Sequence, residues 1–255
     1  MLIADMLFTQ GHGTRRVCAG LIERQLVEVL NENNAYHTVE PAQTAIKNVA
    51  DGMPYRVQGT PWQYHERAYV MLHKPAGFEC SHKPSAWPSV YTLLPSPLRL
   101  RPNKNAIQGV QAVGRLDQDT TGLLLFSDDG QFIHRMSSPK HHVPKVYQVT
   151  CKHAVDDAQI AKLLAGVVLD DSPQPVRAAA CVQTGELTLD LTLTEGKYHQ
   201  VKRMLAAVAN RVEGLHRASM GHVDAEGQGG LSLLDLPSGE WRWLTGAEVA
   251  VLQGM

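Results

Sequence analysis

The spacing of hydrophobic residues predicts several strands and a smaller number of helices. From position 187 to 194, leucine alternates with threonine or aspartate, which is the period-two pattern of a strand with one buried face. The apolar run at 68–72 and the alternating stretch at 147–150 predict two further strands. From 198 to 209 the apolar residues recur three or four positions apart, which predicts a helix with Lys202 and Arg203 beside its apolar stripe.

The N-terminal sixty residues predict a small unit of two helices and a strand. Residues 2–7 have helical spacing, and Gly11-His12-Gly13 breaks that helix. Thr14 is expected to cap a second helix, whose apolar face would hold Val17, Leu21 and Ile22. A strand is predicted at 27–30.

Proline and glycine mark the expected divisions of the chain. The stretch Gly52–Pro61 predicts a linker, and five prolines between 84 and 102 predict a loop. Asp156 or Asp157 could cap a helix that follows them. Because strands outnumber helices, the predicted fold class is mixed α+β, with domains at residues 1–60 and 61–255.

Composition narrows the class of protein. At 255 residues, with 44% hydrophobic and 19% charged residues, the chain is neither disordered nor collagen-like. Its densest apolar run, residues 123–126, is far shorter than the roughly 20 residues that are needed to span a bilayer. The four cysteines form no CxxC pair, so neither a disulfide framework nor a zinc ribbon is expected. With an acid at position 5 and no basic start, a secretory signal is not expected, and the expected compartment is the cytoplasm.

The net charge of −1 argues at first against a nucleic-acid partner, because such proteins usually carry a basic excess. The charge is uneven along the chain, however. Residues 99–145 hold seven bases, four acids and three histidines, and residues 197–217 hold five bases and one acid. Residues 1–60 hold five bases against six acids. We therefore expect two local positive regions and little basic charge in the N-terminal unit.

The stretch from Gly114 to Gly122, GRLDQDTTG, is the main candidate for chemistry. Its Asp and Thr side chains could simply cap a turn before the apolar run that follows. The spacing Asp117-x-Asp119-x-Thr121 also occurs in haloacid-dehalogenase phosphatases, but the approach to Asp117 is interrupted by Gly and Arg, which disfavours that interpretation.

Several blocks in the same order resemble the ribosomal small-subunit type of pseudouridine synthase. They are LHKPAG from 72, GRLDQDTTGLLLFSDDG from 114, SPKHH from 138, KVY from 145, EGKYHQVKRM from 195 and GEWR from 239. This resemblance implies a curved, mixed but largely antiparallel sheet flanked by helices. It also implies an isomerase that converts a uridine of ribosomal RNA into pseudouridine.

The resemblance assigns roles to individual residues. Asp117 matches the essential aspartate, Lys202 its basic partner, with Arg203 as second choice, and Tyr147 the tyrosine that stacks on the extruded uracil. Arg115 matches a residue that fills the space the base leaves. Further RNA contacts are expected at Lys140, His141, His142, Lys145, His199 and Arg203. Residues 1–60 resemble an S4 RNA-binding domain, with Arg15 and Arg16 as its contacts.

The resemblance also sets expectations about substrate and cofactors. The target is expected in 16S RNA, within an assembling small-subunit particle, with 23S RNA or a non-catalytic assembly factor as alternatives. His141-His142 could indicate a metal, but no third ligand follows at a known spacing. We expect catalysis by a monomer without a metal or an organic cofactor.

Overall fold

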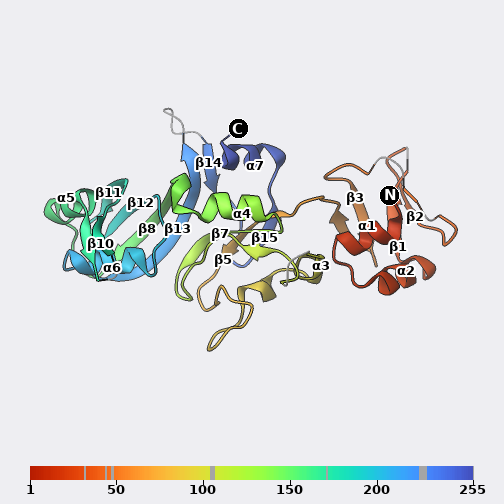
Figure 1. Ribbon diagram of the computed structural model, residues 1–255, viewed down its shortest axis with the longest axis horizontal. Coiled ribbons are helices and arrows are strands. Elements are labelled where there is room, and N and C mark those ends of the chain that lie inside the picture. Colours follow the sequence, from red (N-terminus) through yellow and green to blue (C-terminus); the bar gives the residue numbers. More distant parts are fainter. Residues whose placement is uncertain are drawn as a thin grey trace. The chain divides into compact units, whose positions relative to one another are not determined.

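The computed structural model describes residues 1–31, 33–43, 45–46, 49–103, 107–170, 172–223 and 229–254 (Figure 1). The chain forms two compact units. The first contains Met1–Ala68 together with Leu94–Gln111, and the second contains Tyr69–Leu93 together with Ala112–Met255. No helix in the described ranges is long and apolar enough to cross a membrane.

Within its described residues, the first unit combines three helices with a four-stranded antiparallel sheet. The helices are α1 (Ile3–Thr9), α2 (Arg15–Glu23) and α3 (Ser96–Leu100). The sheet has the order β2-β1-β3-β4, with β1 (Val27–Leu30), β2 (Tyr36–Thr38), β3 (Pro54–Val57) and β4 (Thr60–Gln63). The predicted helices and the strand at 27–30 are confirmed, and the Thr14 hydroxyl accepts a hydrogen bond from the Val17 amide as expected of a cap.

The predicted linker at Gly52–Pro61 is wrong, because this stretch forms the β3–β4 hairpin. Gln58 and Gly59 have positive φ angles of 52° and 76°, which is the backbone of a two-residue hairpin turn. Pro61 is tolerated because β4 is an edge strand. The alternation that identifies β3 as a strand is short: only Tyr55 and Val57 point into the core.

The buried face of α2 also differs from the prediction. Val17 is half exposed, whereas Cys18 and Ile22 are buried. Cys18 can face the core because its thiol behaves as a small apolar group.

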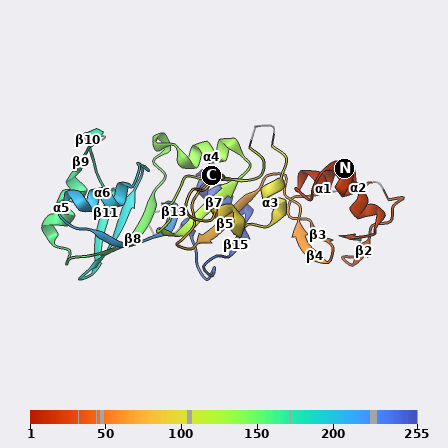
Figure 2. The same cartoon turned by 90° about the horizontal axis from the view of Figure 1, so that it is seen from below.

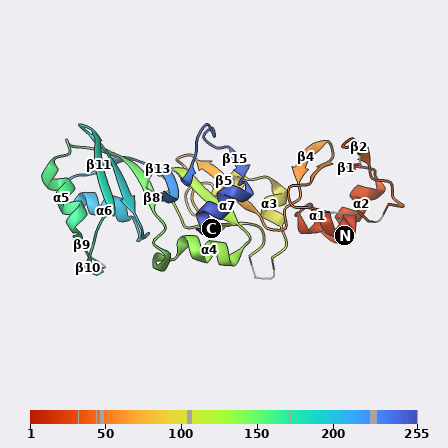
Figure 3. The ribbon, with the colours of Figure 1, turned by 90° about the horizontal axis from the view of Figure 1, so that it is seen from above.

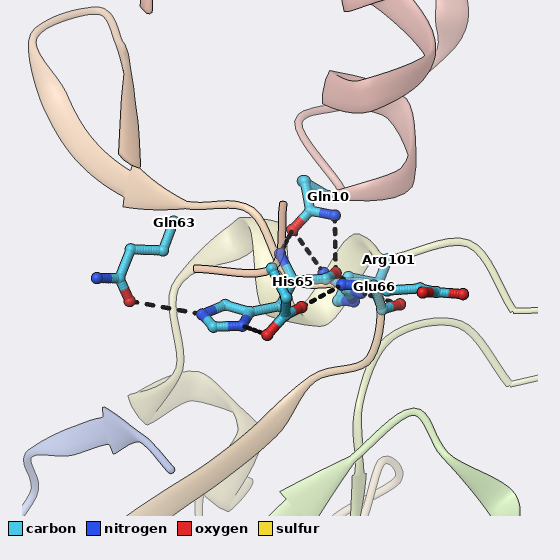
Figure 4. A network of polar contacts seen from close by, with 6 residues as sticks. Gln10, Gln63, His65, Glu66 and Arg101 are labelled. Carbon is cyan, nitrogen blue, oxygen red and sulfur yellow. Dashed lines mark hydrogen bonds and ion pairs between the residues drawn. The ribbon is translucent and has the colours of Figure 1, made fainter. Parts of the chain in front are cut away.

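Residues 94–111 belong to the first unit because Arg101 is buried in it. The Arg101 side chain donates hydrogen bonds to Gln10 Oε1 at 2.8 Å, to the His65 carbonyl at 2.8 Å and to the Glu66 carbonyl at 3.1 Å (Figure 4). Gln10 also contacts the His65 backbone through both of its side-chain amide atoms. The unit thus extends past the predicted boundary at residue 60 and takes in a segment from within the predicted second domain.

The second unit is built on a nine-stranded mixed sheet. Its main path runs β11-β12-β8-β13-β7-β5-β15; β14 pairs with β13 and β6 with β7. In the described part of this sheet the β13–β7 pairing is parallel, whereas β13 with β8 and β14, β12 with β8 and β11, and β5 with β7 and β15 pair antiparallel. The strands are β5 (Tyr69–Lys74), β6 (Gln111–Ala112), β7 (Thr121–Ser127), β8 (Lys145–Cys151), β11 (Ala180–Gly185), β12 (Thr188–Leu193), β13 (Val212–Val223), β14 (Gly229–Ser232) and β15 (Trp241–Trp243). A separate ribbon pairs β9 (Val167–Leu169) with β10 (Ser172–Val176).

Helices cover this sheet at two places. α5 packs against β11 and α6 against β9 and β13, whereas α4 packs against β7 and α7 against β13 and β14 (Figures 2 and 3). The helices are α4 (Gly130–Ser137), α5 (Asp157–Ala165), α6 (Gln200–Ala207) and α7 (Gly246–Gln253), with short 3-10 turns η1 (Val90–Leu93) and η2 (Pro139–His141). The core beneath α4 and α7 is a cluster of buried apolar residues that includes Met71, Leu123, Leu125, Phe132 and Met220.

The sequence predictions for this unit hold in most places. The alternating leucines at 189, 191 and 193 are buried on β12, while Leu187 lies before the strand and is exposed. Asp156 rather than Asp157 caps α5. The predicted loop at 84–102 contains η1 and α3. The fold class is α+β, as predicted.

Candidate active site

A cavity of about 640 Å³ in the second unit is lined by half of the twelve site residues that the sequence predicted. Its walls come from the loop before β7, from β8, from β13 and from the turn that opens α6. Six candidates line it, namely Arg115, Asp117, Lys145, Tyr147, His199 and Lys202. The structure therefore brings together residues that lie up to 87 positions apart, from Arg115 to Lys202.

Asp117 lies between two basic side chains. Its Oδ2 is 3.1 Å from Lys202 Nζ, and its Oδ1 is 3.3 Å from His199 Nε2. Lys202 Nζ also donates to both oxygens of Asp119, at 2.7 and 2.9 Å. The Asp117 side chain is 28% exposed, so a ligand in the cavity can reach a carboxylate that is contacted by the Lys202 ammonium and by the His199 imidazole.

Lys202 and Asp119 shift each other's pKa, and Asp117 contributes to the shift of Lys202. Burial alone lowers the pKa of Lys202, but hydrogen bonds from its ammonium to Asp119 and Asp117 outweigh burial and raise it. Burial alone raises the pKa of Asp119, and the bond and charge of Lys202 outweigh that effect and lower it. Lys202 is thus held as a cation beside Asp117 across the neutral pH range.

Lys74, which sequence reasoning did not select, fixes the loop that carries Asp117. It ends β5 and is fully buried, and its Nζ donates to the carbonyls of Pro75 at 3.0 Å, Gln118 at 3.3 Å and Thr120 at 2.9 Å. The amide of Gly77 donates to the same Gln118 carbonyl at 2.8 Å. Burial lowers the pKa of Lys74, and the nearby cysteine and aspartates partly oppose that shift.

Gly122 lets the first residues of β7 approach β13. It has a φ of 111°, and a Cβ atom there would lie 2.3 Å from the Arg217 carbonyl oxygen. Only glycine fits such a contact without a shift of the backbone. The glycine in the motif therefore has a packing reason that the sequence alone does not reveal.

The floor of the cavity is basic. Lys145 and Tyr147 lie two residues apart on β8, and Arg217 is the register partner of Tyr147 on β13. Burial, followed by the charge of Arg217, lowers the pKa of Lys145 to about 8. Arg217 is 2% exposed; its Nε donates to the Leu123 carbonyl at 2.7 Å, and its Nη2 is buried without a hydrogen-bond partner among the described residues.

The other predicted contacts lie outside the cavity walls. Lys140, His141 and His142 are exposed around η2. Arg203 on α6 donates to the carbonyl of Tyr198, which precedes that helix. Arg15 and Arg16 belong to α2 of the first unit, where Arg15 pairs with Asp5 and covers the Phe8 ring.

Sequence reasoning did not select Asp119, Lys74, Arg217 and Tyr198. Asp119 is part of the motif itself, and its distance of two residues from Asp117 was the available signal. Lys74 and Arg217 act through contacts with distant backbone, for which no local pattern exists. In the part of the chain that the structure describes, no group of three or more His, Cys, Asp or Glu side chains is placed to hold a metal ion.

Such a site suits chemistry on a sugar. A carboxylate accompanied by a fixed cation stays ionised and can act as a nucleophile or as a base. A basic floor and an aromatic wall suit a nucleotide with its phosphate.

Comparisons with known proteins relate the chain to one family. Residues 68–207 match the family model described as RNA pseudouridylate synthase. The chain is 40% identical over 189 residues to a ribosomal small subunit pseudouridine synthase A of Haemophilus influenzae, covering 73% of this chain and 74% of that protein. The corresponding protein of Pasteurella multocida is 38% identical over 182 residues, covering 71% and 72%.

A solved structure extends the similarity to the whole chain. The chain matches one titled "Crystal structure of pseudouridylate synthase" with a TM-score of 0.64 and 30% identity, covering 99% of both chains. The predicted fold and the predicted isomerase activity are confirmed. The chain belongs to the RNA pseudouridylate synthase family.

Proposed function

We propose that this protein converts a uridine of 16S ribosomal RNA into pseudouridine and that Asp117 is its catalytic carboxylate. The observation that carries the proposal is the position of Asp117 in the cavity, 3.1 Å from the Lys202 ammonium. The choice of RNA is supported by the similar proteins, whose names specify the ribosomal small subunit.

The reaction needs few groups. The C1′–N1 bond of uridine breaks, the uracil turns, and a C5–C1′ bond forms. The proton on C5 is lost and N1 gains one, so atoms and charge balance without an oxidant or a co-substrate. The uridine must first leave the stack, because its glycosidic bond is not accessible within a helix.

Two routes start from the Asp117 carboxylate. In one it attacks C1′ and forms a covalent sugar ester, and in the other it removes a proton from C2′. Both need an ionised carboxylate, and the Lys202 ammonium lies 3.1 Å from Asp117 Oδ2. Tyr147, 9% exposed on the cavity wall, is assigned to stack on the extruded uracil. Arg115, exposed at the cavity, is assigned to the space that the base leaves.

RNA binding is assigned mainly to the second unit. Lys140, His141, His142, Lys145, His199 and Arg203 are our proposed contacts there. The first unit is assigned as an S4-like RNA-binding domain with Arg15 and Arg16 as contacts. Since Arg15 already pairs with Asp5, this unit should contribute little electrostatic attraction.

The proposal includes the setting of the reaction. The substrate is proposed to be an assembling small-subunit particle, and the enzyme is proposed to act as a monomer in the cytoplasm. A preference for particles over free RNA would appear as faster modification of assembly intermediates than of naked 16S RNA.

The experiment is tritium release from RNA labelled at C5 of uridine. Wild-type protein should release tritium from 16S RNA or its particles, and Asp117→Asn, which keeps the size of the side chain, should release none above background. Release from 23S RNA but not from 16S RNA would contradict the proposed substrate. Equal release by wild type and Asp117→Asn would remove Asp117 from its role.

A further inference from the structure

The turn that precedes α6 presents an aromatic ring to the cavity. Tyr198 is 74% exposed and lines the cavity. Its ring lies nearly parallel to the imidazole of His199, with centroids 3.8 Å apart and planes 21° apart. One face of the Tyr198 ring is therefore covered by His199.

The position of this pair is fixed to the catalytic carboxylate. His199 Nε2 is 3.3 Å from Asp117 Oδ1, so a single imidazole separates the Tyr198 ring from Asp117. His199 has a left-handed backbone, with φ at 47°, a conformation that is strained for a residue with a Cβ atom and that is often found at functional sites.

Hydrogen bonds hold the turn around the pair. Arg203 Nη1 donates to the Tyr198 carbonyl at 3.0 Å, and the Lys197 amide donates to Gln200 Oε1 at 2.8 Å. Both bonds use the backbone of the turn rather than the phenol. Among the described residues the Tyr198 hydroxyl has no hydrogen-bond partner, so the fold makes no visible use of that group.

We propose that the free face of Tyr198 is a stacking platform for the base next to the target uridine, an inference that rests on the function proposed above. Single-stranded RNA is recognised by stacking of unpaired bases on aromatic side chains. When the uridine enters the cavity, its neighbour loses a stacking partner. The Tyr198 platform offers a replacement one ring away from Asp117.

The charges around the platform suit a nucleic acid. Lys197, on the same turn, also lines the cavity, and Arg203 lies one helical turn further along α6. These cations are close enough to the platform to attract the phosphates that flank the stacked base. The same turn would thus contact the base and the backbone of one nucleotide.

The test combines a protein change with a substrate change. Once wild-type enzyme has identified its uridine, three RNA fragments are prepared: the complete sequence, one abasic at the 5′ neighbour and one abasic at the 3′ neighbour. Steady-state kinetics are measured with Tyr198→Ala, with Tyr198→Phe, which keeps the ring, and with Val182→Ala. Val182 is 59% exposed on β11 and does not line the cavity, so it serves as a matched control.

On the complete fragment, Tyr198→Ala should raise KM about tenfold, the effect of one lost base stack. Tyr198→Phe should stay close to wild type because the ring is retained. On one of the two abasic fragments, wild type and Tyr198→Ala should have the same KM, because the base that used the platform is gone. Val182→Ala should match wild type on every fragment.

Two results overturn the platform while leaving the proposed function intact. One is an unchanged KM for Tyr198→Ala on the complete fragment. The other is an equal loss on all three fragments, which would show that the tyrosine only maintains the turn. Absence of pseudouridine formation by wild type in 16S RNA would instead overturn the proposed function itself.

Discussion

Replacing Lys74 by methionine should slow the reaction although Lys74 does not line the cavity. The buried ammonium bridges three carbonyls, of Pro75, Gln118 and Thr120, and so holds the loop that carries Asp117. Methionine keeps the length and apolar character of the stem but cannot donate a hydrogen bond.

The magnitude follows from these contacts. Three hydrogen bonds at about 1 kcal/mol each give a loss of about 3 kcal/mol in the free energy of unfolding. Removal of a buried charge offsets part of that loss, in agreement with the lowered pKa of Lys74. If the loop moves by about 1 Å, kcat should fall about 100-fold, with a smaller effect on KM.

The assay is steady-state tritium release, which gives kcat and KM, with urea denaturation to measure stability. Lys152→Met is the matched control, because Lys152 is exposed and lies outside the cavity walls. A folded Lys74→Met protein whose kcat is within twofold of the control would refute the role of Lys74 in positioning the catalytic loop.

Three further predictions test other parts of the structure. Arg101→Leu removes the hydrogen bonds to Gln10 and to the His65 and Glu66 backbone, so it should destabilise the first unit by about 3 kcal/mol. Limited proteolysis between residues 1 and 68 should then be faster, and an unchanged rate would contradict the prediction. Burial lowers the pKa of Lys145 to about 8, so the buried ammonium destabilises the folded state below that pH. The penalty is relieved as the pH rises toward the pKa that Lys145 has in the unfolded chain, and wild type should gain about 2 kcal/mol of unfolding free energy over Lys145→Met between pH 8 and pH 10. A difference in unfolding free energy that does not change with pH would show that the buried ammonium carries no such penalty. Gly122→Ala should reduce the yield of folded protein or lower its midpoint of thermal unfolding by several degrees, because the added Cβ would meet the Arg217 carbonyl oxygen. An unchanged midpoint would show that β7 and β13 can move apart at little cost.

Regular hydrophobic periodicity made some elements predictable from sequence. The alternating leucines of β12 run long enough for their period of two to exclude a helix. The apolar stripe of α6 likewise runs long enough for its helical period to exclude a strand. The β3–β4 hairpin was missed because its strands are only four residues each. They contain Pro54 and Pro61, and the turn between them contains Gly59, all of which are typical of a linker. Its turn depends on a left-handed Gln58, which composition does not reveal.

The site residues that lie within a sequence motif could be predicted from the sequence. Asp117, Tyr147 and Lys202 were selected through family-like blocks, and the structure places all three at one cavity. Lys74 and Arg217 could not be found in this way, since their roles depend on backbone carbonyls 44 and 94 residues away. The same holds for Arg101, whose segment joins the first unit through contacts with residues 10 and 65.

Pseudouridine formation by wild type and Asp117→Asn on 16S RNA tests the central claim most directly. Asparagine preserves the size and the hydrogen-bonding shape of the side chain but removes the charge that faces Lys202. The account predicts one modified uridine with wild type, none with Asp117→Asn, and equal thermal stability of the two proteins within about 1 kcal/mol. Modification of the same uridine at the same rate by both proteins would contradict it.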